Sequence, residues 1–362
     1  MKRGLLLLLT AVFGLGVLAG CGSEGKTEDS VSVAPPEIVG SVPQLRFLLP
    51  QEADKNIVDA HQAGFAAALQ EALRQQGWTV DEIGLRVAET ENAAGKALDD
   101  KSAEVAILPA SQYFSYGDAA ALLMTATKPG VSVDTTEPAP WNGSVDAPSY
   151  TDREVPYSRT LICTTVSPLG QEIAQQAKNG TLTWETMAEA EWLMPKTLLS
   201  SDFLYPQLYL KNTFGKQLEE LPSMQTIDGY GALFHDAAVG AADVIVIAAD
   251  KRIDYAEAWR LAEDQMDHTG KLGLGRKDSI FNEVQVIGVT DPIFGDVMAL
   301  RTEEEPYQSE GFREALKAAL GTMKNDPDAR AIWESCGYTG FVALEDSAYD
   351  NIREETIYGA GD

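Results

Sequence analysis

Apolar and polar positions follow two different periods along this chain. Between residues 57 and 76 the apolar side chains recur at helical spacing, and Gly77 follows them directly. Residues 45–49 and 103–108 are instead short apolar runs with the length of buried strands. Short strands that alternate with amphipathic helices predict an α/β fold with a largely parallel sheet.

The same signals continue to the end of the chain. They predict further strands at 85–87, 160–166, 192–194, 243–248 and 284–289, and helices at 92–98, 183–190, 203 onward, 232–239, 312–323 and 327–335. Residues 127–156 break the pattern, because they are dense in Pro, Gly, Thr and Asp. This segment is expected to form a long surface loop.

The N-terminus has the features of an export signal. Two cationic residues precede an apolar stretch at 4–18, which is too short for a stable membrane span. The sequence at 18–21, Leu-Ala-Gly-Cys, resembles the lipobox of bacterial lipoproteins. That resemblance implies removal of residues 1–20 and acylation of Cys21, so that lipid holds the protein at a membrane. The alternative is an ordinary signal peptide followed by a chance cysteine.

Residues 21–43 are expected to form a flexible tether. They are rich in Gly, Ser, Glu, Pro and Lys and contain no aromatic residue, so they cannot bury a core. The remaining residues are numerous enough for two domains of ordinary size.

The charge of the chain limits its partners. The formal net charge is −27, which repels nucleic acid and anionic lipid headgroups at long range. No nucleic-acid partner is therefore expected. An anionic small molecule is not excluded, since a local array of N–H groups can outweigh a screened distant field.

No motif in the sequence points to catalysis. The three histidines lie far apart, without cysteines or acids at metal-ligand spacing, and neither HExxH nor GxSxG occurs. The glycine-rich segment at 270–277 lacks the Walker spacing and is expected to be a flexible basic loop. Cys163 and Cys336 could form a disulfide in an oxidising location, but buried free cysteines are the favoured expectation. We expect no catalytic residue, no metal and no cofactor, and a protein that is not an enzyme.

Seven short segments carry motifs that matter through their order along the chain. They are AEVAILPASQY at 103–113, YSRTLI at 157–162, SSDFLYP at 200–206, VGAAD at 239–243, TDPI at 290–293, and GFV at 340–342 with SAYD at 347–350. Together they resemble the phosphonate-binding family of periplasmic binding proteins, which also serves phosphate- and phosphite-type uptake. The resemblance spans nearly all of the chain after the tether.

The resemblance implies an α/β fold of the type 2 periplasmic-binding class. One lobe would comprise 44–157 plus 291–362 and the other 158–290, with two crossover segments and a ligand cleft between the lobes. It also implies an extracytoplasmic solute-binding protein that delivers its ligand to the permease of an ABC importer.

The expected ligand-binding residues follow from the same motifs. Ser200 and Ser201 precede a helix, where hydroxyl and free N–H groups could bind an oxyanion; a simple helix cap is the alternative. Ser111 and Tyr113 follow a strand, the position where α/β sheets bind ligands, although a packed tyrosine is the alternative there. Gln51 is also included among the expected ligand-binding residues.

The chain departs from the family pattern at several of these positions. The glycine after the serines is Asp202, a tyrosine of the family falls near Glu91, and its histidine falls at Tyr230. An acid or amide of the family falls near Ala248. A carboxylate in the cleft would oppose a phosphonate or pair with an ammonium group. The alternatives are therefore the same fold with an amine-containing or uncharged metabolite, or a sensory lipoprotein.

Overall fold

The computed structural model describes residues 36–90, 92–115, 119–196 and 204–349. The export signal, Cys21, and residues 21–35 of the expected tether lie outside this part. Among the described helices, none is long and apolar enough to cross a membrane.

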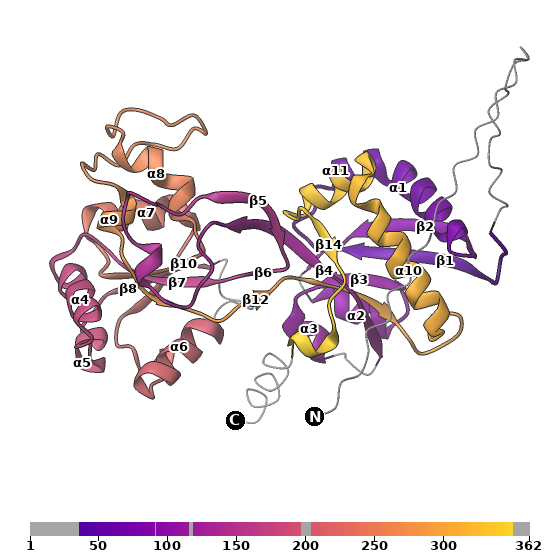
Figure 1. The fold of residues 1–362 in the computed structure, drawn as a ribbon, viewed down its shortest axis with the longest axis horizontal. Coiled ribbons are helices and arrows are strands. Elements are labelled where there is room, and N and C mark those ends of the chain that lie inside the picture. The colour runs from indigo at the N-terminus through magenta and orange to yellow at the C-terminus, as the bar shows by residue number, and fades with distance from the viewer. Residues whose placement is uncertain (1–35, 91, 116–118, 197–203, 350–362) are drawn as a thin grey trace, which may run out of the picture. The chain divides into compact units, whose positions relative to one another are not determined.

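The first of two large sheets contains strands from both ends of the described chain (Figure 1). Its order is β14-β4-β13-β3-β1-β2, with β5 paired to β4. The bounds are β1 Gly40–Leu49, β2 Trp78–Val87, β3 Val105–Leu108, β4 Ala120–Val131, β5 Tyr150–Val155, β13 Val297–Arg301 and β14 Gly340–Val342.

The directions of these strands correct one prediction. β1 is parallel to β2 and β3, but β13 is antiparallel to both β3 and β4. The prediction of a largely parallel sheet was therefore wrong. The difference arises at β13, which comes near the end of the sequence but lies between β3 and β4, two strands from much earlier in the sequence.

Helices cover both faces of the first sheet. Phe47 and Leu48 are neighbours in β1 but belong to hydrophobic clusters on opposite faces, as the two-residue period of a strand requires. One cluster contains α1 (Lys55–Gln75), α10 (Glu310–Thr322) and α11 (Pro327–Ser335). The other contains α2 (Ala93–Asp99) and α3 (Ala110–Ser115).

The start of the first sheet lies within the expected tether. β1 begins at Gly40, which pairs with Trp78 of β2. A Cβ atom at residue 40 would lie 2.3 Å from the Trp78 ring, so only glycine fits there. Residues 40–43 are consequently part of a strand.

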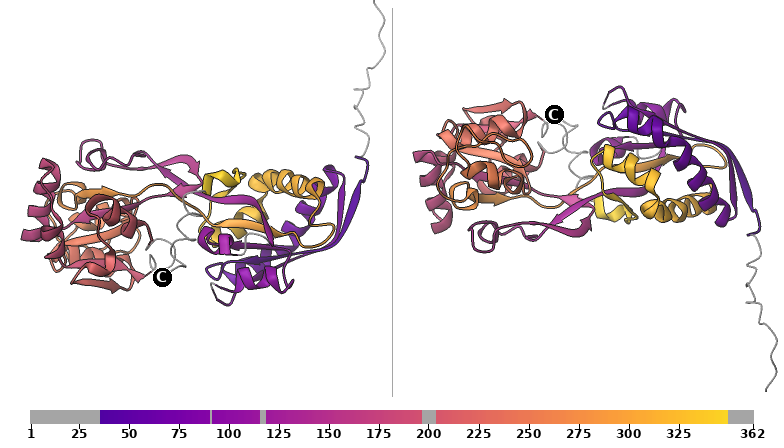
Figure 2. Two further views of the ribbon diagram at one scale, coloured as in Figure 1. Left: turned by 90° about the horizontal axis from the view of Figure 1, so that it is seen from below. Right: turned by 90° about the horizontal axis from the view of Figure 1, so that it is seen from above.

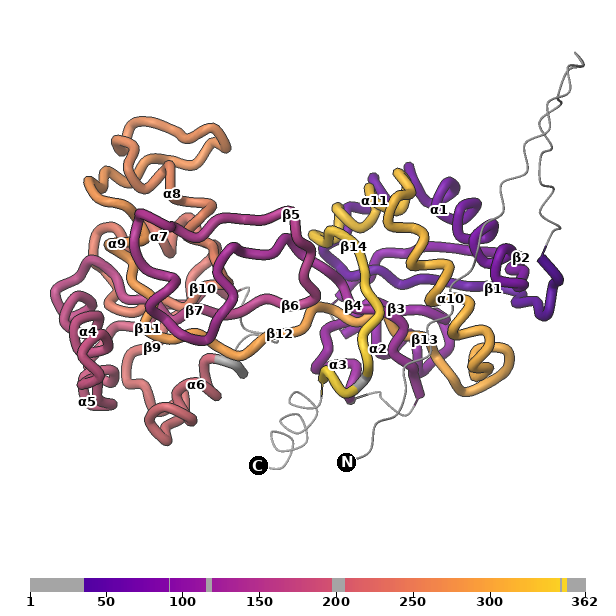
Figure 3. The backbone as a smooth tube through the Cα atoms, in the orientation of Figure 1, coloured from indigo at the N-terminus to yellow at the C-terminus, as the bar shows by residue number. Residues whose placement is uncertain are grey.

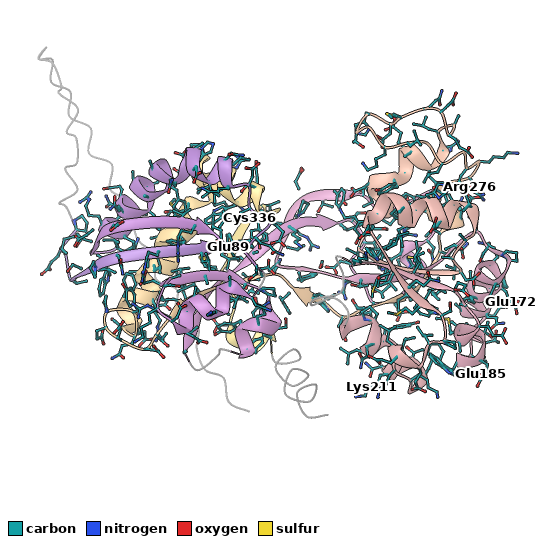
Figure 4. The ribbon with its side chains drawn as sticks, turned by 180° about the vertical axis from the view of Figure 1, so that it is seen from behind. Glu89, Glu172, Glu185, Lys211, Arg276 and Cys336 are labelled. Atoms are coloured by element: carbon teal, nitrogen blue, oxygen red, sulfur yellow. The ribbon has the colours of Figure 1, made fainter. Side chains whose placement is uncertain are left out.

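The second large sheet has the order β11-β7-β10-β8-β9. Its strands are β7 Thr160–Thr164, β8 Trp192–Pro195, β9 Met224–Ile227, β10 Val244–Ala248 and β11 Val286–Val289. The helices around it are α4 Pro168–Asn179, α5 Trp184–Ala188, α6 Leu204–Phe214, α7 Gly229–Val239, α8 Arg252–Arg260 and α9 Ile280–Glu283. β10, β8 and β9 are parallel, whereas β7 is antiparallel to β10 and β11. Figure 4 shows the Glu172 and Glu185 side chains on the outer surface of α4 and α5.

Two crossover segments connect the sheets, and they lie side by side (Figure 3). β6 (Tyr157–Ser158) pairs with β12 (Ile293–Phe294) in an antiparallel two-stranded sheet. These positions correspond to the YSRTLI and TDPI motifs of the sequence.

The segment expected to be a surface loop connects two paired strands, and most of its residues between them are exposed or half-buried. β4 continues to Val131 and pairs with β5, and residues between them reach the core of the second sheet (Figure 2). Trp141 is only 1% exposed, and its indole donates a hydrogen bond of 3.0 Å to the Thr135 carbonyl. The Asn142 side-chain amide donates a hydrogen bond to the Val286 carbonyl in β11 and accepts one from the Val286 N–H. Residues 132–149 thus form the predicted loop, with one 3-10 turn at 139–141, whereas the flanking residues 127–131 and 150–155 form strands. Burial of Trp141 attaches this loop to the second sheet.

The two cysteines of the described part are free and buried. Cys163 belongs to the core of the second sheet and Cys336 to that of the first. Burial raises the pKa of both thiols to about 12. Each therefore behaves as a small apolar side chain.

Candidate functional site

Three residues follow the carboxyl ends of the parallel strands β1, β2 and β3. Two of them, Gln51 and Ser111, were predicted from the sequence, and Glu89 was not. Gln51 follows β1, Glu89 follows β2 (Figure 4) and Ser111 lies in the first turn of α3 after β3. Gln51 and Glu89 are exposed, and the Gln51 amide donates a 3.1 Å hydrogen bond to Glu52. Because β1 lies between β2 and β3, these strand ends share one edge of the sheet. Glu89 was missed in the sequence because nothing in its motif distinguishes it from a solvated acid.

Tyr113 lies deeper than the other expected residues of this edge. It is 5% exposed and packs within the cluster of α2 and α3, with its ring edge against Phe114. Its hydroxyl donates a long hydrogen bond of 3.5 Å to the Ala120 carbonyl. The geometry matches the packed tyrosine that was considered as the alternative.

In the second sheet, Tyr230 connects the start of α7 to the end of β10. Its hydroxyl accepts a 3.2 Å hydrogen bond from the Ala248 N–H, and its ring stacks on Phe234. The Lys251 ammonium lies 5.8 Å from the ring centre. Ala248, near which the resemblance places an acid or amide, carries no polar side chain, and the Lys251 ammonium lies close by, next to the Tyr230 ring.

Four of the expected ligand-binding residues lie outside the described residues: Glu91, Ser200, Ser201 and Asp202. The elements on either side of the serine motif are described. β8 ends at Pro195 and α6 begins at Leu204, which agrees with the helix predicted from residue 203.

A cavity of about 410 Å³ lies beside the β4–β5 hairpin, a volume within the range of ligand sites. It is enclosed by the hairpin, the first crossover and the turn after β10. The residues that line it are Lys128, Pro129, Val131, Val133, Asp134, Trp141, Tyr150, Arg153, Val155, Tyr157, Ser158, Arg159, Ala248, Ala249, Lys251, Asp254 and Gly337. None of them was among the residues expected from the sequence.

Positive charges outnumber negative charges around this cavity, whereas the whole chain is strongly acidic. Four cationic side chains line it, Lys128, Arg153, Arg159 and Lys251, whereas the carboxylates are those of Asp134 and Asp254. The chain as a whole has a net charge of −27. A local excess of positive charge in such a chain favours an anion at this place.

Asp134 organises the arginines of the cavity. Its Oδ1 accepts from Arg159 Nε at 3.0 Å, and its Oδ2 accepts from the Tyr157 hydroxyl at 2.5 Å and from Arg153 at 3.3 Å. Burial alone would raise the pKa of Asp134, but the hydrogen bonds from Tyr157 and Arg159 outweigh it and lower the pKa below its ordinary value. The carboxylate is thus ionised and holds both guanidinium groups in place.

Tyr150 and α8 close the opposite side of the cavity. The Tyr150 hydroxyl donates a 2.9 Å hydrogen bond to Asp254, which also accepts from Lys251 at 2.7 Å. Burial, followed by the Asp254 charge, raises the pKa of Tyr150, so its hydroxyl keeps its proton. These contacts join the hairpin to α8, which carries Asp254 and directly follows Lys251.

The family model of the phosphonate ABC transporter periplasmic substrate-binding protein matches residues 47–349. The chain belongs to this family. As a member, it is a small-molecule-binding component of an ABC transporter, which implies a permease as partner and an extracytoplasmic location. No curated protein matches the sequence significantly.

Solved structures confirm the predicted two-lobed periplasmic-binding fold. Mh-p37 of Mycoplasma hyorhinis, described as a putative thiamine pyrophosphate transporter, aligns with a TM-score of 0.60 at 10% identity, over 88% of this chain and 98% of its own. XAC2383 of Xanthomonas citri bound to ATP aligns with a TM-score of 0.51 at 12% identity, over 87% and 96%. PhnD1 of Prochlorococcus marinus in complex with methylphosphonate aligns with a TM-score of 0.49 at 12% identity, over 88% and 98%.

No group of His, Cys, Asp and Glu side chains in the described ranges could hold a metal ion. The side chains that gather at the strand ends and around the cavity are suited to hydrogen bonding and to charge pairing. This arrangement can bind a polar or anionic solute.

Proposed function

We propose that this chain is the lipid-anchored binding component of an ABC importer and that its ligand carries an oxyanion such as a phosphonate, phosphate or phosphite group. The observation that carries the proposal is the position of the expected residues at strand ends, in a chain whose family binds such solutes. In each sheet they follow the carboxyl ends of parallel strands, at Gln51 and Ser111 in one and at Tyr230 in the other. In this proposal the protein binds its solute without converting it, and no catalytic group is required.

The ligand would be held between two lobes, 44–157 plus 291–362 and 158–290. Each lobe would contribute the N–H groups of helix starts, which favour negative charge without a formal cation. A solute that touches both lobes would favour the closed state through its differential contacts.

An amine-containing ligand is the second candidate, and the acidic residues of the chain favour it. Asp202 replaces a glycine of the family pattern, and Glu89 is exposed at the carboxyl edge of the first sheet. A carboxylate near the ligand would pair with an ammonium group and oppose a dianion.

The lipid anchor rests on the sequence of residues 18–21. Cys21→Ala is expected to abolish acylation and to leave the precursor or a secreted protein. Mass spectrometry of the N-terminus of the native protein measures this directly. An unmodified N-terminus downstream of residue 21 in the wild type would contradict the anchor.

The serine motif gives the test of the ligand class. A thermal-shift screen over phosphate, phosphite, phosphonates and amines first identifies a stabilising solute. Ser200→Ala and Ser201→Ala should then each weaken binding of an oxyanion about ten- to a hundredfold, since each removes a hydrogen bond to a charged group worth about 1.5–3 kcal/mol. Calorimetric titration measures the loss.

Asp202→Gly separates the two ligand classes. It should strengthen binding of a phosphonate or phosphate, because it removes a like charge, and weaken binding of an amine that pairs with the carboxylate. Unchanged affinity in both serine variants would show that the motif is only a helix cap.

A further inference from the structure

We propose that the cavity beside the β4–β5 hairpin binds the organic body and a second anionic group of the transported solute. The ligand would then be an extended organic oxyanion with two anionic ends, such as a phosphonate or phosphate ester that also bears a carboxylate. Inorganic phosphate and methylphosphonate would fill only part of the site. This inference rests on the proposed oxyanion-binding function and names the class of substrate more closely.

The cavity adjoins the expected binding residues of the second sheet. Ala248 lines the cavity, and its N–H donates to the hydroxyl of Tyr230. Lys251 also lines the cavity, and its ammonium lies 5.8 Å from the centre of the Tyr230 ring. Two residues of the cavity wall, Ala248 and Lys251, thus contact Tyr230 directly, which places the cavity next to the start of α7.

The volume of the cavity exceeds what a small oxyanion needs. At roughly 30 Å³ for each water molecule, a space of about 410 Å³ corresponds to about a dozen waters. A phosphonate group with a single methyl substituent has only five non-hydrogen atoms. The remaining volume fits an organic group attached to the oxyanion.

The walls of the cavity specify what this organic group is like. Val131, Val133 and Val155 provide apolar surface from the hairpin, and Tyr150 adds the face or edge of a ring. A flat or apolar body can be buried against these side chains. The two carboxylates of the cavity, Asp134 and Asp254, are already bonded to cationic side chains of its wall, and the lining residues at the end of β10 are alanines.

The cations of the cavity have bonding capacity left for an anion. Arg153 donates one hydrogen bond to Asp134, and Arg159 donates one to Asp134 and one to the Thr290 carbonyl, although a guanidinium carries five N–H donors. Asp254 accepts one from Lys251, whose ammonium has three donors. Lys128 makes no ion pair among the described residues. Two positive charges thus exceed the carboxylates present, which matches a second anionic group on the ligand.

Three related probes test the body and the second charge separately. Methylphosphonate has neither, phenylphosphonate has a flat apolar body, and 4-phosphonobenzoate has the body and a carboxylate. Calorimetric titration of the wild type should give affinities that rise in this order. Each step should be about tenfold, as expected for a buried ring and for one charged hydrogen bond.

A matched pair of lysine variants locates the second charge. Lys251→Met should weaken binding of 4-phosphonobenzoate at least tenfold and leave phenylphosphonate and methylphosphonate within about twofold. Lys251→Arg should retain most of the affinity. Lys178→Met, on the exposed surface of α4, changes the net charge equally and should leave all three probes unaffected.

Each outcome of these titrations decides the inference. If Lys251→Met and Lys178→Met bind 4-phosphonobenzoate with equal affinity and still bind methylphosphonate, the cavity site is overturned. The proposed oxyanion function then remains intact. An equal loss of all three probes in Lys251→Met would also overturn it, because Lys251 would then contact the phosphonate itself. Failure of the wild type to bind any of the probes would overturn the oxyanion proposal and this inference with it.

Discussion

Replacement of Arg252 by methionine is expected to lower the free energy of unfolding by about 3–5 kcal/mol, because it leaves a buried carboxylate without its partner. The Arg252 side chain is fully buried, and so is that of Asp250. Arg252 Nη2 lies 2.6 Å from Asp250 Oδ2, and Nε lies 2.9 Å from Oδ1. Such a pair adds little net stability over an apolar pair, but the loss of one member is costly.

The same guanidinium also connects three segments of the chain. It donates to the carbonyl of Val284 at the end of α9 at 2.7 Å and to the carbonyl of Trp141 in the hairpin at 2.8 Å. The variant therefore leaves two buried carbonyl groups with fewer partners as well. Because Trp141 lines the proposed binding cavity, the hairpin should become less firmly attached to the second sheet.

Scanning calorimetry measures this effect. With about 2–4 °C for each kcal/mol in a domain of this size, the transition should fall by roughly 6–20 °C. Arg260→Met, at the exposed end of the same helix, should change the unfolding free energy by less than about 0.5 kcal/mol. The double variant Asp250→Leu with Arg252→Met should be more stable than Arg252→Met alone, since no charge remains buried. A single variant as stable as the wild type would refute the role of the pair.

Replacement of Glu104 by methionine should destabilise the first sheet by a similar amount, about 3–5 kcal/mol at neutral pH. Glu104 is fully buried just before β3, between β1 and β13. It accepts from the Arg46 N–H at 2.8 Å and from Arg46 Nε at 2.9 Å, and Arg301 Nη2 lies 3.3 Å away. Its removal leaves Arg301, which is 5% exposed, with Glu304 as its remaining carboxylate partner.

The stability contributed by Glu104 should depend on pH in a defined direction. Burial raises the pKa of Glu104, but the hydrogen bonds and charge of Arg46, together with the charge of Arg301, outweigh it and lower the pKa below its ordinary value. A group with a lowered folded-state pKa stabilises fully above its unfolded value, about 4.3, and loses this contribution as pH falls further. The difference in melting temperature between the wild type and Glu104→Met should therefore be largest near pH 7 and should narrow below about pH 4.3.

A matched acid on the surface separates this effect from general charge repulsion. Glu82→Met, on an exposed position of β2, removes the same charge and should leave the unfolding free energy within about 0.5 kcal/mol. A difference between wild type and Glu104→Met that stays constant from pH 7 to pH 3 would contradict the assigned role of the carboxylate.

The sequence by itself determined the local elements and the family of this protein. Apolar periodicity predicted α1, β3, β10 and the last helices, because each of these patterns lies within a dozen or two neighbouring residues. The order of short motifs predicted the family and the two crossovers. Gln51 and Ser111 lie just beyond predicted strands, at the edge where such sheets bind ligands, whereas Tyr230 was named because a histidine of the family pattern falls there.

Only the tertiary structure decided what distant segments do together. The antiparallel insertion of β13 depends on pairing across the whole chain, and no local pattern encodes the direction of a strand. The Arg252–Trp141 hydrogen bond joins residues 111 positions apart, and the cavity takes its cations from the hairpin, the first crossover and the turn after β10. Each of these residues looks in the sequence like an ordinary surface charge or a tryptophan in a loop. Burial of Trp141 brings them together, because the apolar surface that it removes from water attaches the loop between β4 and β5 to the second sheet.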